Sequence, residues 1–179
     1  EISLETRLLP QWSRGYFGLD VLMNHGLFPE EEMARALIVS NTLKGATTAI
    51  GSVIAEGLTM SGVEAEVKDA SEVEKESDLT DYDAYVFGSA TYHGEMLQHM
   101  KRILFLAEKA RLRGKVGGAF GAFGWSGEAP DRIFKTMLNI LGMKMVMGPL
   151  RLKSAEETHG PEKAREYGRL IVQRLKEQT

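Results

Sequence analysis

The feature that most constrains this chain is a direct succession of strand, turn and helix patterns near residue 40. Ala36–Val39 is a short apolar run rich in branched residues, which is typical of a buried strand. A polar turn with a single glycine, Ser40–Ala46, follows, and a helical pattern begins at about Thr47. Backbone N–H groups at the start of a helix attract anions. The pattern therefore predicts either an anion-binding loop or an ordinary turn with Thr47 as the helix N-cap.

The residues of this turn narrow the choice of anion. It lacks the G-x-x-x-x-G-K-[ST] pattern of P-loop nucleotide sites and the G-x-G-x-x-G pattern of dinucleotide sites. Its hydroxyl groups, on Ser40, Thr42 and Thr47, suit a single phosphomonoester at one end of a larger cofactor. Flavin mononucleotide (FMN) is a ligand of that kind.

From residue 36 onward the chain alternates between strand and helix patterns. Further strands are predicted at Val63–Lys68, Ala84–Gly88 and Lys115–Phe120, with a fifth at Lys144–Met147 and Leu150–Leu152 that is broken at Gly148-Pro149. Helices are predicted at Ile50–Leu58, Met96–Ala110, Pro130–Leu141 and Pro161–Lys176. Such units, joined by right-handed crossovers, give an α/β fold: a doubly wound, five-stranded parallel sheet in three α/β/α layers.

Three loops are predicted to meet at one edge of this sheet, because parallel strands all end at the same edge. Ligands bind at this edge in such sheets, where the strand order reverses. The first is the turn at Ser40–Thr47. The second, Ser89–Gly94, carries hydroxyls, an aromatic ring and an imidazole. The third, Gly121–Gly127, combines aromatic rings with glycines that let the backbone approach a flat ligand. A phosphate cradle beside aromatic, amide-rich walls fits FMN better than a sugar phosphate.

Three motifs at these strand ends resemble the flavodoxin-like FMN domain, and in particular the flavodoxin domain of flavodiiron (A-type) flavoproteins. They are Asn41–Thr47, Val86–Thr91 and the glycine- and aromatic-rich Gly121–Ala129. The resemblance covers residues 36–179 and implies a flavodoxin-like fold with bound FMN. It also implies the cofactor-binding residues: Ser40, Thr42, Leu43, Lys44, Gly45, Ala46 and Thr47 at the phosphate, and Ser89, Ala90, Thr91, Tyr92, His93, Gly94, Gly121, Ala122, Phe123, Gly124 and Trp125 around the flavin ring and ribityl chain.

The chain departs from the usual pattern of that family at three places. Lys44 stands where an aromatic is usual, Ala90 where proline is usual, and Tyr92-His93 where small polar amides are usual. These changes leave the choice of cofactor intact and put the redox potential and the choice of partner in question. The four histidines are scattered and do not form the ligand series of the flavodiiron metal site: His25, His93, His99 and His159.

Two redox functions follow from the resemblance, and a third class stays open. The first is an electron carrier between a reductase and a separate acceptor, with a metalloprotein subunit as one candidate acceptor. The alternative is an NAD(P)H-dependent quinone or flavin reductase, since nicotinamide sites on this fold need no separate fingerprint. The apolar N-terminal arm, residues 1–35, is expected to pack on its own domain, with partner docking as the alternative. In the third class, a non-redox interaction module, this arm matters more than the flavin. Either a homodimer or a hetero-complex agrees with these functions.

Composition restricts these functions further. The net charge of −3 and the lack of a basic tract argue against nucleic-acid binding. The absence of cysteine excludes disulfides and thiolate metal sites and leaves any redox role to a non-covalent cofactor. No run reaches the roughly 20 apolar residues of a membrane span, and no signal-peptide pattern is present, so a cytoplasmic protein is expected.

Overall fold

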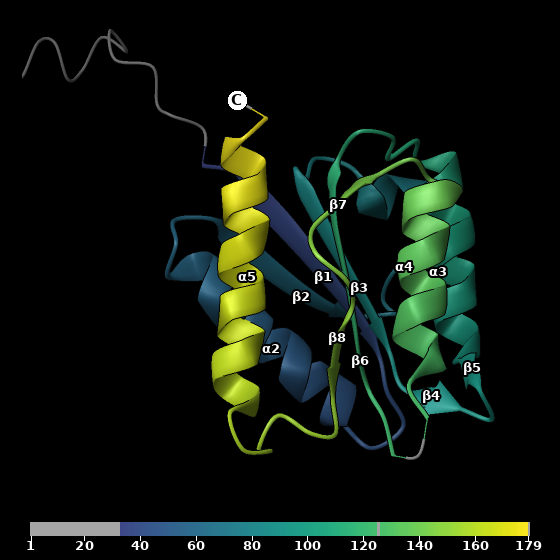
Figure 1. Ribbon diagram of the computed structural model, residues 1–179. Coiled ribbons are helices and arrows are strands. Elements are labelled where there is room, and N and C mark those ends of the chain that lie inside the picture. Colours follow the sequence, from purple (N-terminus) through teal and green to yellow (C-terminus); the bar gives the residue numbers. More distant parts are fainter. Residues whose placement is uncertain (1–32, 125, 179) are drawn as a thin grey trace, which may run out of the picture. The chain divides into compact units, whose positions relative to one another are not determined.

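The structure is a computed structural model that describes residues 33–124 and 126–178 (Figure 1). Nearly all of the predicted N-terminal arm, residues 1–35, lies outside the described residues, so its role and the domain boundary at residue 36 stay predictions. None of the described helices is long and apolar enough to cross a membrane.

One parallel sheet forms the middle layer of the described chain. Its strands are β1 (Arg35–Asn41), β2 (Glu64–Asp69), β3 (Ala84–Ser89), β6 (Val116–Ala122), β7 (Lys144–Met145) and β8 (Leu150–Leu152). Their order is β2-β1-β3-β6-β7, with β8 also paired to β6, and every pairing is parallel. Because β7 and β8 pair with opposite ends of β6, together they take the place of a fifth strand. The predicted doubly wound sheet is confirmed, including its break at Gly148-Pro149.

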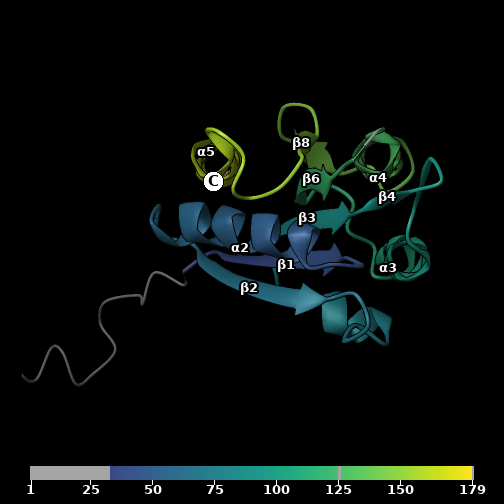
Figure 2. The ribbon, with the colours of Figure 1, turned by 90° about the horizontal axis from the view of Figure 1, so that it is seen from below.

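Helices cover both faces of the sheet (Figures 1 and 2). α2 (Ala46–Thr59) and α5 (Gly160–Lys176) lie on one face, and α3 (Gln98–Lys109) and α4 (Glu128–Asn139) on the other. Successive residues of a strand point to opposite faces, so β1 contributes to both cores. Ala36 and Ile38 pack with α2 and α5, whereas Leu37 and Val39 pack with α3 and α4. A continuous apolar run is therefore required at this central strand, as the sequence predicts.

Two glycines let α2 and α5 pack backbone against backbone. A Cβ atom on Gly57 would lie 2.2 Å from the carbonyl oxygen of Arg165, and one on Gly168 would lie 2.5 Å from the carbonyl oxygen of Ile54. Neither position accepts a side chain unless a helix moves. The contact joins the first and last helices of the described fold into one layer over the sheet.

Several boundaries differ from the prediction. α2 begins at Ala46 instead of Ile50, and β6 continues to Ala122, which places Gly121 in the strand and not in the loop. The segment after Ser89, predicted as a loop, contains an antiparallel hairpin of β4 (Thr91–Tyr92) and β5 (Glu95–Met96). His93 and Gly94 form its two-residue turn with φ of 50° and 74°. Positive φ at both positions matches the twist of tight hairpins.

The break in the fifth strand leaves one amide of β6 without a strand partner. β7 pairs with Val116 and Gly117, and β8 pairs from Phe120 onward. Between them, the N–H of Ala119 donates to the hydroxyl of Tyr167 at an N···O distance of 3.0 Å. Tyr167 is buried, and burial raises the pKa of its phenol, so the hydroxyl stays neutral. A side chain from α5 thus replaces the missing strand residue.

We expect Tyr167→Phe to lower the free energy of unfolding by about 1–3 kcal/mol, because it leaves a buried amide unpaired. Urea unfolding followed by circular dichroism measures the change. Tyr92→Phe is the matched control: Tyr92 is exposed, and its loss of a hydroxyl should change stability by no more than about 0.5 kcal/mol. Equal stability of Tyr167→Phe and the unmodified protein would show that another group satisfies Ala119.

Candidate functional site

The carboxyl ends of β1, β3 and β6 meet at one edge of the sheet, the lower end in Figure 1. Asn41 at the end of β1 lies beside Ser89 at the end of β3. A Cβ atom on Gly121, near the end of β6, would lie 2.3 Å from the carbonyl oxygen of Ser89, so this close approach requires glycine. The structure therefore brings the three predicted loops together.

The first loop ends in an open helix N-terminus. Gly45 is the N-cap of α2, with a left-handed φ of 86°, and its N–H donates to the hydroxyl of Thr42 at 3.0 Å. No described side chain caps the helix, so its first N–H groups are without a capping partner. Thr47 is the second residue of α2, which means that the alternative with Thr47 as N-cap is wrong.

The hydroxyls beneath this turn differ in their hydrogen bonding. Ser40 Oγ and Thr48 Oγ1 lie 3.0 Å apart and share a hydrogen bond. Thr47 is fully buried, and its Oγ1 has no hydrogen-bond partner among the described residues. An unpaired buried hydroxyl costs about 1–3 kcal/mol. Its place in the first turn of a helix would allow it to donate to an anion bound there, such as a phosphate oxygen.

Asn41 holds the first and second loops together, and sequence reasoning missed this role. Its carbonyl oxygen accepts the N–H of Ala90 at 3.0 Å, and its Oδ1 accepts the N–H of Met100 at 3.3 Å. Ser89 also binds the start of α3, because its Oγ accepts the N–H of the N-cap residue Leu97 at 3.0 Å. The first motif contains Asn41, yet the contact with Met100 joins residues 59 positions apart, which a local pattern does not reveal.

The hairpin β4–β5 carries the aromatic part of the second loop. Tyr92 and His93 are exposed, and their rings meet edge to face with centroids 4.2 Å apart. On the opposite strand, Glu95 pairs with Lys101 of α3 at 3.0 Å and with Arg132 of α4 at 2.9 Å. The hydrogen bond from Lys101, with the charge of Arg132, lowers the pKa of the Glu95 carboxyl. The hairpin is thereby linked to both helices on its side of the sheet.

The third loop joins β6 to α4 and contacts its neighbours on two sides. The N–H of Phe123 donates to the carbonyl oxygen of Leu152 at 3.1 Å, which extends the pairing of β6 with β8. Thr91 Oγ1, from the second loop, accepts the N–H of Ala129 at 3.2 Å and so caps the first turn of α4. These hydrogen bonds fix the third loop between the hairpin and β8.

The predicted site residues differ in how far they are exposed to solvent. Trp125 lies outside the described residues, so its place over the cofactor stays a prediction. Five predicted residues are buried and shape the site from beneath: Ser40, Thr47, Ser89, Gly121 and Ala122. Six are exposed and can meet a ligand from its rim: Leu43, Lys44, Gly45, Tyr92, His93 and Gly124. The prediction missed Glu128, whose Oε2 is buried without a hydrogen-bond partner among the described residues.

The two adjacent threonines of α2 should respond differently to removal of the hydroxyl. In protein stripped of small molecules, we expect Thr47→Val to leave the free energy of unfolding unchanged or raised by up to about 1 kcal/mol, since it removes an unpaired buried hydroxyl. Thr48→Val should lower it by about 1 kcal/mol, because Ser40 loses its partner. Urea unfolding of both variants measures the difference, and an equal loss in both would show that Thr47 is hydrogen-bonded without a ligand.

Comparisons with known proteins agree with this geometry. The family model for flavodoxin matches residues 38–168. A putative diflavin flavoprotein A 2 of Thermosynechococcus vestitus is 31% identical over 152 residues, which cover 82% of this chain and 26% of the relative. The rubredoxin-oxygen oxidoreductase of Megalodesulfovibrio gigas is 30% identical over 100 residues, covering 56% of this chain and 25% of the relative. The chain thus spans about a quarter of the length of these two curated relatives.

Two further similarities bear on the fold and on the alternative function. The solved structure of an archaeal flavodoxin superposes with a TM-score of 0.74 at 28% identity, covering 79% of this chain and 99% of the flavodoxin. An NAD(P)H dehydrogenase (quinone) of Archaeoglobus fulgidus is 29% identical over 116 residues, covering 49% of this chain and 61% of the relative.

Proposed function

Because the chain belongs to the flavodoxin family, whose members bind FMN, we propose that the three-loop site holds FMN and that the protein serves as an electron carrier. The observation that carries this proposal is the buried, unpaired hydroxyl of Thr47 beside the uncapped N-terminus of α2. Both features are unfavourable in isolation, and a phosphate seated in the turn would satisfy both.

The phosphate would be held by the first N–H groups of α2 and by the hydroxyls of Thr42 and Thr47. Thr42 Oγ1 accepts the N–H of Gly45, so its own O–H can donate to a phosphate oxygen. Ser40 has a different role from the one expected, because its hydroxyl is shared with Thr48. We propose that Ser40 positions the turn and does not touch the phosphate.

The flavin ring would lie between the hairpin of the second loop and the third loop. Tyr92 and His93 supply an aromatic wall whose position is set by the ion pairs of Glu95. Phe123 and Gly124, with Trp125, would face the other side. Bound FMN supplies the chemistry, since it accepts and releases electrons, while the protein binds, orients and tunes it.

The identity of the redox partners remains part of this proposal. The name of the rubredoxin-oxygen oxidoreductase supports electron exchange with separate proteins. We therefore propose a reductase as electron donor and a separate acceptor, with a metalloprotein subunit as one candidate acceptor. The similarity to an NAD(P)H dehydrogenase (quinone) supports the alternative, a quinone or flavin reductase. We place the carrier first because the flavodoxin model matches the greater part of the chain. A cytoplasmic location and assembly as a homodimer or hetero-complex are proposed with it.

The purified protein should be yellow and release FMN on denaturation. In stripped protein, Thr47→Val should weaken FMN binding by roughly 10- to 100-fold, the effect of losing a hydrogen bond worth about 1.5–3 kcal/mol to a charged group. Quenching of flavin fluorescence on titration measures the affinity. Thr136→Val is the control, because its hydroxyl donates to the carbonyl of Arg132 within α4, outside the three loops. Unchanged affinity in Thr47→Val would place the phosphate elsewhere.

Direct reaction with nicotinamide nucleotides separates the two redox functions. We expect the FMN-loaded protein to oxidise NADH or NADPH only slowly in the presence of a quinone, and quickly once a flavin-reducing reductase is added. Absorbance at the nicotinamide band follows the reaction. Fast turnover without the added reductase would favour the enzyme over the carrier.

A further inference from the structure

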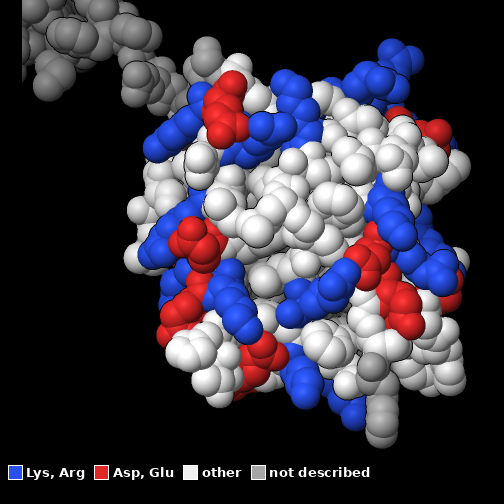
Figure 3. All heavy atoms as spheres, viewed as in Figure 1, with Lys and Arg blue, Asp and Glu red and all other residues white. Residues whose placement is uncertain are grey.

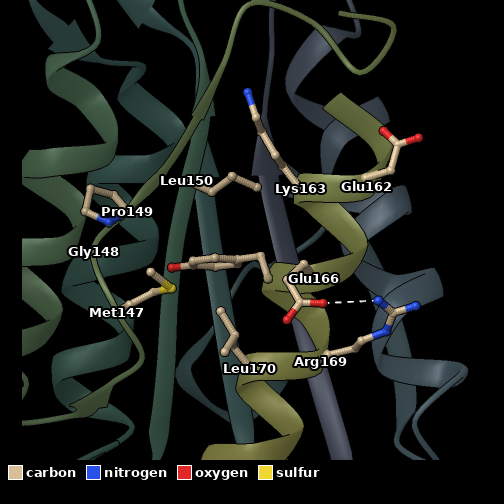
Figure 4. A pocket seen from close by; sticks show the side chains of 10 residues that line it. Met147, Gly148, Pro149, Leu150, Glu162, Lys163, Glu166, Arg169 and Leu170 are labelled. Atoms are coloured by element: carbon tan, nitrogen blue, oxygen red, sulfur yellow. Dashed lines mark hydrogen bonds and ion pairs between the residues drawn. The ribbon is translucent and has the colours of Figure 1, made fainter. Parts of the chain in front are cut away.

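A hollow lies between α5 and the broken fifth strand (Figure 4). Its volume is about 530 Å³, and its uncharged lining comes from Met147, Gly148, Pro149, Leu150, Tyr167 and Leu170. Along α5 it continues into a hollow of about 410 Å³ that shares Met147 and Leu170. We call the surface formed by residues 144–153 and the adjoining side of α5 the fifth-strand face.

Met147 stands out on this face. For the methionines from Met137 to Met147 the sequence favours a core-filling role over a partner surface, and Met137 and Met143 are buried. Met147 is instead 66% exposed, so the prediction is wrong at this position. The reason is the strand break, which turns the chain away from β6 after Val146. A flexible, apolar side chain exposed at the edge of an apolar hollow is typical of an interaction surface.

The strand side of the hollow is basic. From Lys144 to Lys153 the chain carries three Lys or Arg residues and no Asp or Glu, although the whole chain has a net charge of −3. The charged residues of α5 that line the two hollows are balanced: Lys163, Arg169 and Arg174 against Glu162, Glu166 and Glu177. Figure 3 shows an uncharged central area with both basic and acidic side chains on either side of it. The segment 144–153 therefore differs in sign from the chain as a whole.

Most carboxylates near the hollow already form ion pairs with arginines. Asp131 pairs with Arg151, and Glu166 pairs with Arg169 at 3.1 Å, as drawn in Figure 4. Lys144 and Lys153 are exposed on the two sides of the strand break, and within the described chain neither ammonium group has a carboxylate partner. Glu162, at the start of α5, is also unpaired there, which leaves the two lysines in excess.

The fifth-strand face is continuous with the third loop of the candidate site. The carbonyl of Leu152 accepts the N–H of Phe123 at 3.1 Å. A Cβ atom on Gly127 would lie 3.3 Å from Cδ of Arg151. A molecule bound on the fifth-strand face would therefore lie next to the loop that we propose to cover the flavin.

From these observations we propose that the fifth-strand face docks an acidic redox protein, which inserts an apolar side chain into the hollow beside Met147. Carboxylates of the partner would face Lys144 and Lys153, and opposite charges speed association and select the partner. The apolar side chain would be the anchor, because buried anchors carry most of the affinity of an interface. Electron exchange at this face rests on the proposed function, whereas the docking itself needs no FMN.

A labelled peptide provides the test. The probe is a fluorescein-labelled peptide with a central Leu-Phe pair flanked by glutamates, and its comparison peptides replace the pair by Ser-Ser or the glutamates by lysines. We expect fluorescence anisotropy to show that the acidic Leu-Phe peptide binds best and that salt weakens it. Met147→Glu should weaken binding by about 10-fold or more. The double variant Lys144→Glu/Lys153→Glu should do the same by reversing the charge.

Two controls match these variants. Met60→Glu changes a methionine that is 68% exposed at the end of α2, and Lys109→Glu reverses a charge on α3. Both should bind the peptide as the unmodified protein does. Equal losses in the control variants, a preference for the lysine peptide, or no binding of the acidic Leu-Phe peptide would each overturn the proposal.

Two further measurements separate this proposal from its competitors. If light scattering shows a dimer that Met147→Glu dissociates, the occupant is a second copy of this chain and the acidic partner is wrong. Peptide binding is also measured on stripped and FMN-loaded protein. Failure to take up FMN would overturn the proposed function and leave the docking result standing, while loss of peptide binding in both forms would overturn only the docking surface.

Discussion

Parallel pairing of β1 with both of its neighbours is the interaction on which the site depends. Because all three central strands run in one direction, each delivers its following loop to the same edge of the sheet. The register then decides which side chains meet, and it sets Asn41 beside Ser89. From that position one asparagine can bind both the second loop and the start of α3. The hydrogen-bonded backbone thus positions the groups that later determine binding.

The loop edge is less favourable without a ligand than the rest of the fold. The sheet faces and the α2–α5 contact are apolar and closely packed, whereas the turn before α2 contains an uncapped helix end and an unpaired hydroxyl. A ligand that binds only the folded state stabilises it in proportion to the logarithm of its concentration over its dissociation constant. Stability and ligand occupancy should therefore be closely coupled in this protein.

Local signals predicted most of the fold, and contacts distant in sequence explain the rest. The apolar runs of β1 and β3 and the Gly148-Pro149 break are local, so the sheet and its interruption could be predicted from sequence. The turn at His93 could not, because a histidine with positive φ carries no glycine-like signal. The bridging role of Asn41 and the exposure of Met147 were also hidden, since both depend on which residues lie opposite in space.

The two edges of the sheet have a consequence for solubility at high concentration. An edge strand presents unpaired backbone groups that can recruit a strand from another chain and start aggregation. On one edge, the fifth strand is cut into two short pieces by Gly148 and by Pro149, which has no N–H to donate. On the other edge, β2 carries Glu64, Glu66 and Lys68, so a neighbouring strand would meet charge at every second residue. Neither edge offers a long, uncharged template, and the interruption that opens the hollow beside Met147 also protects the sheet from amyloid-like growth.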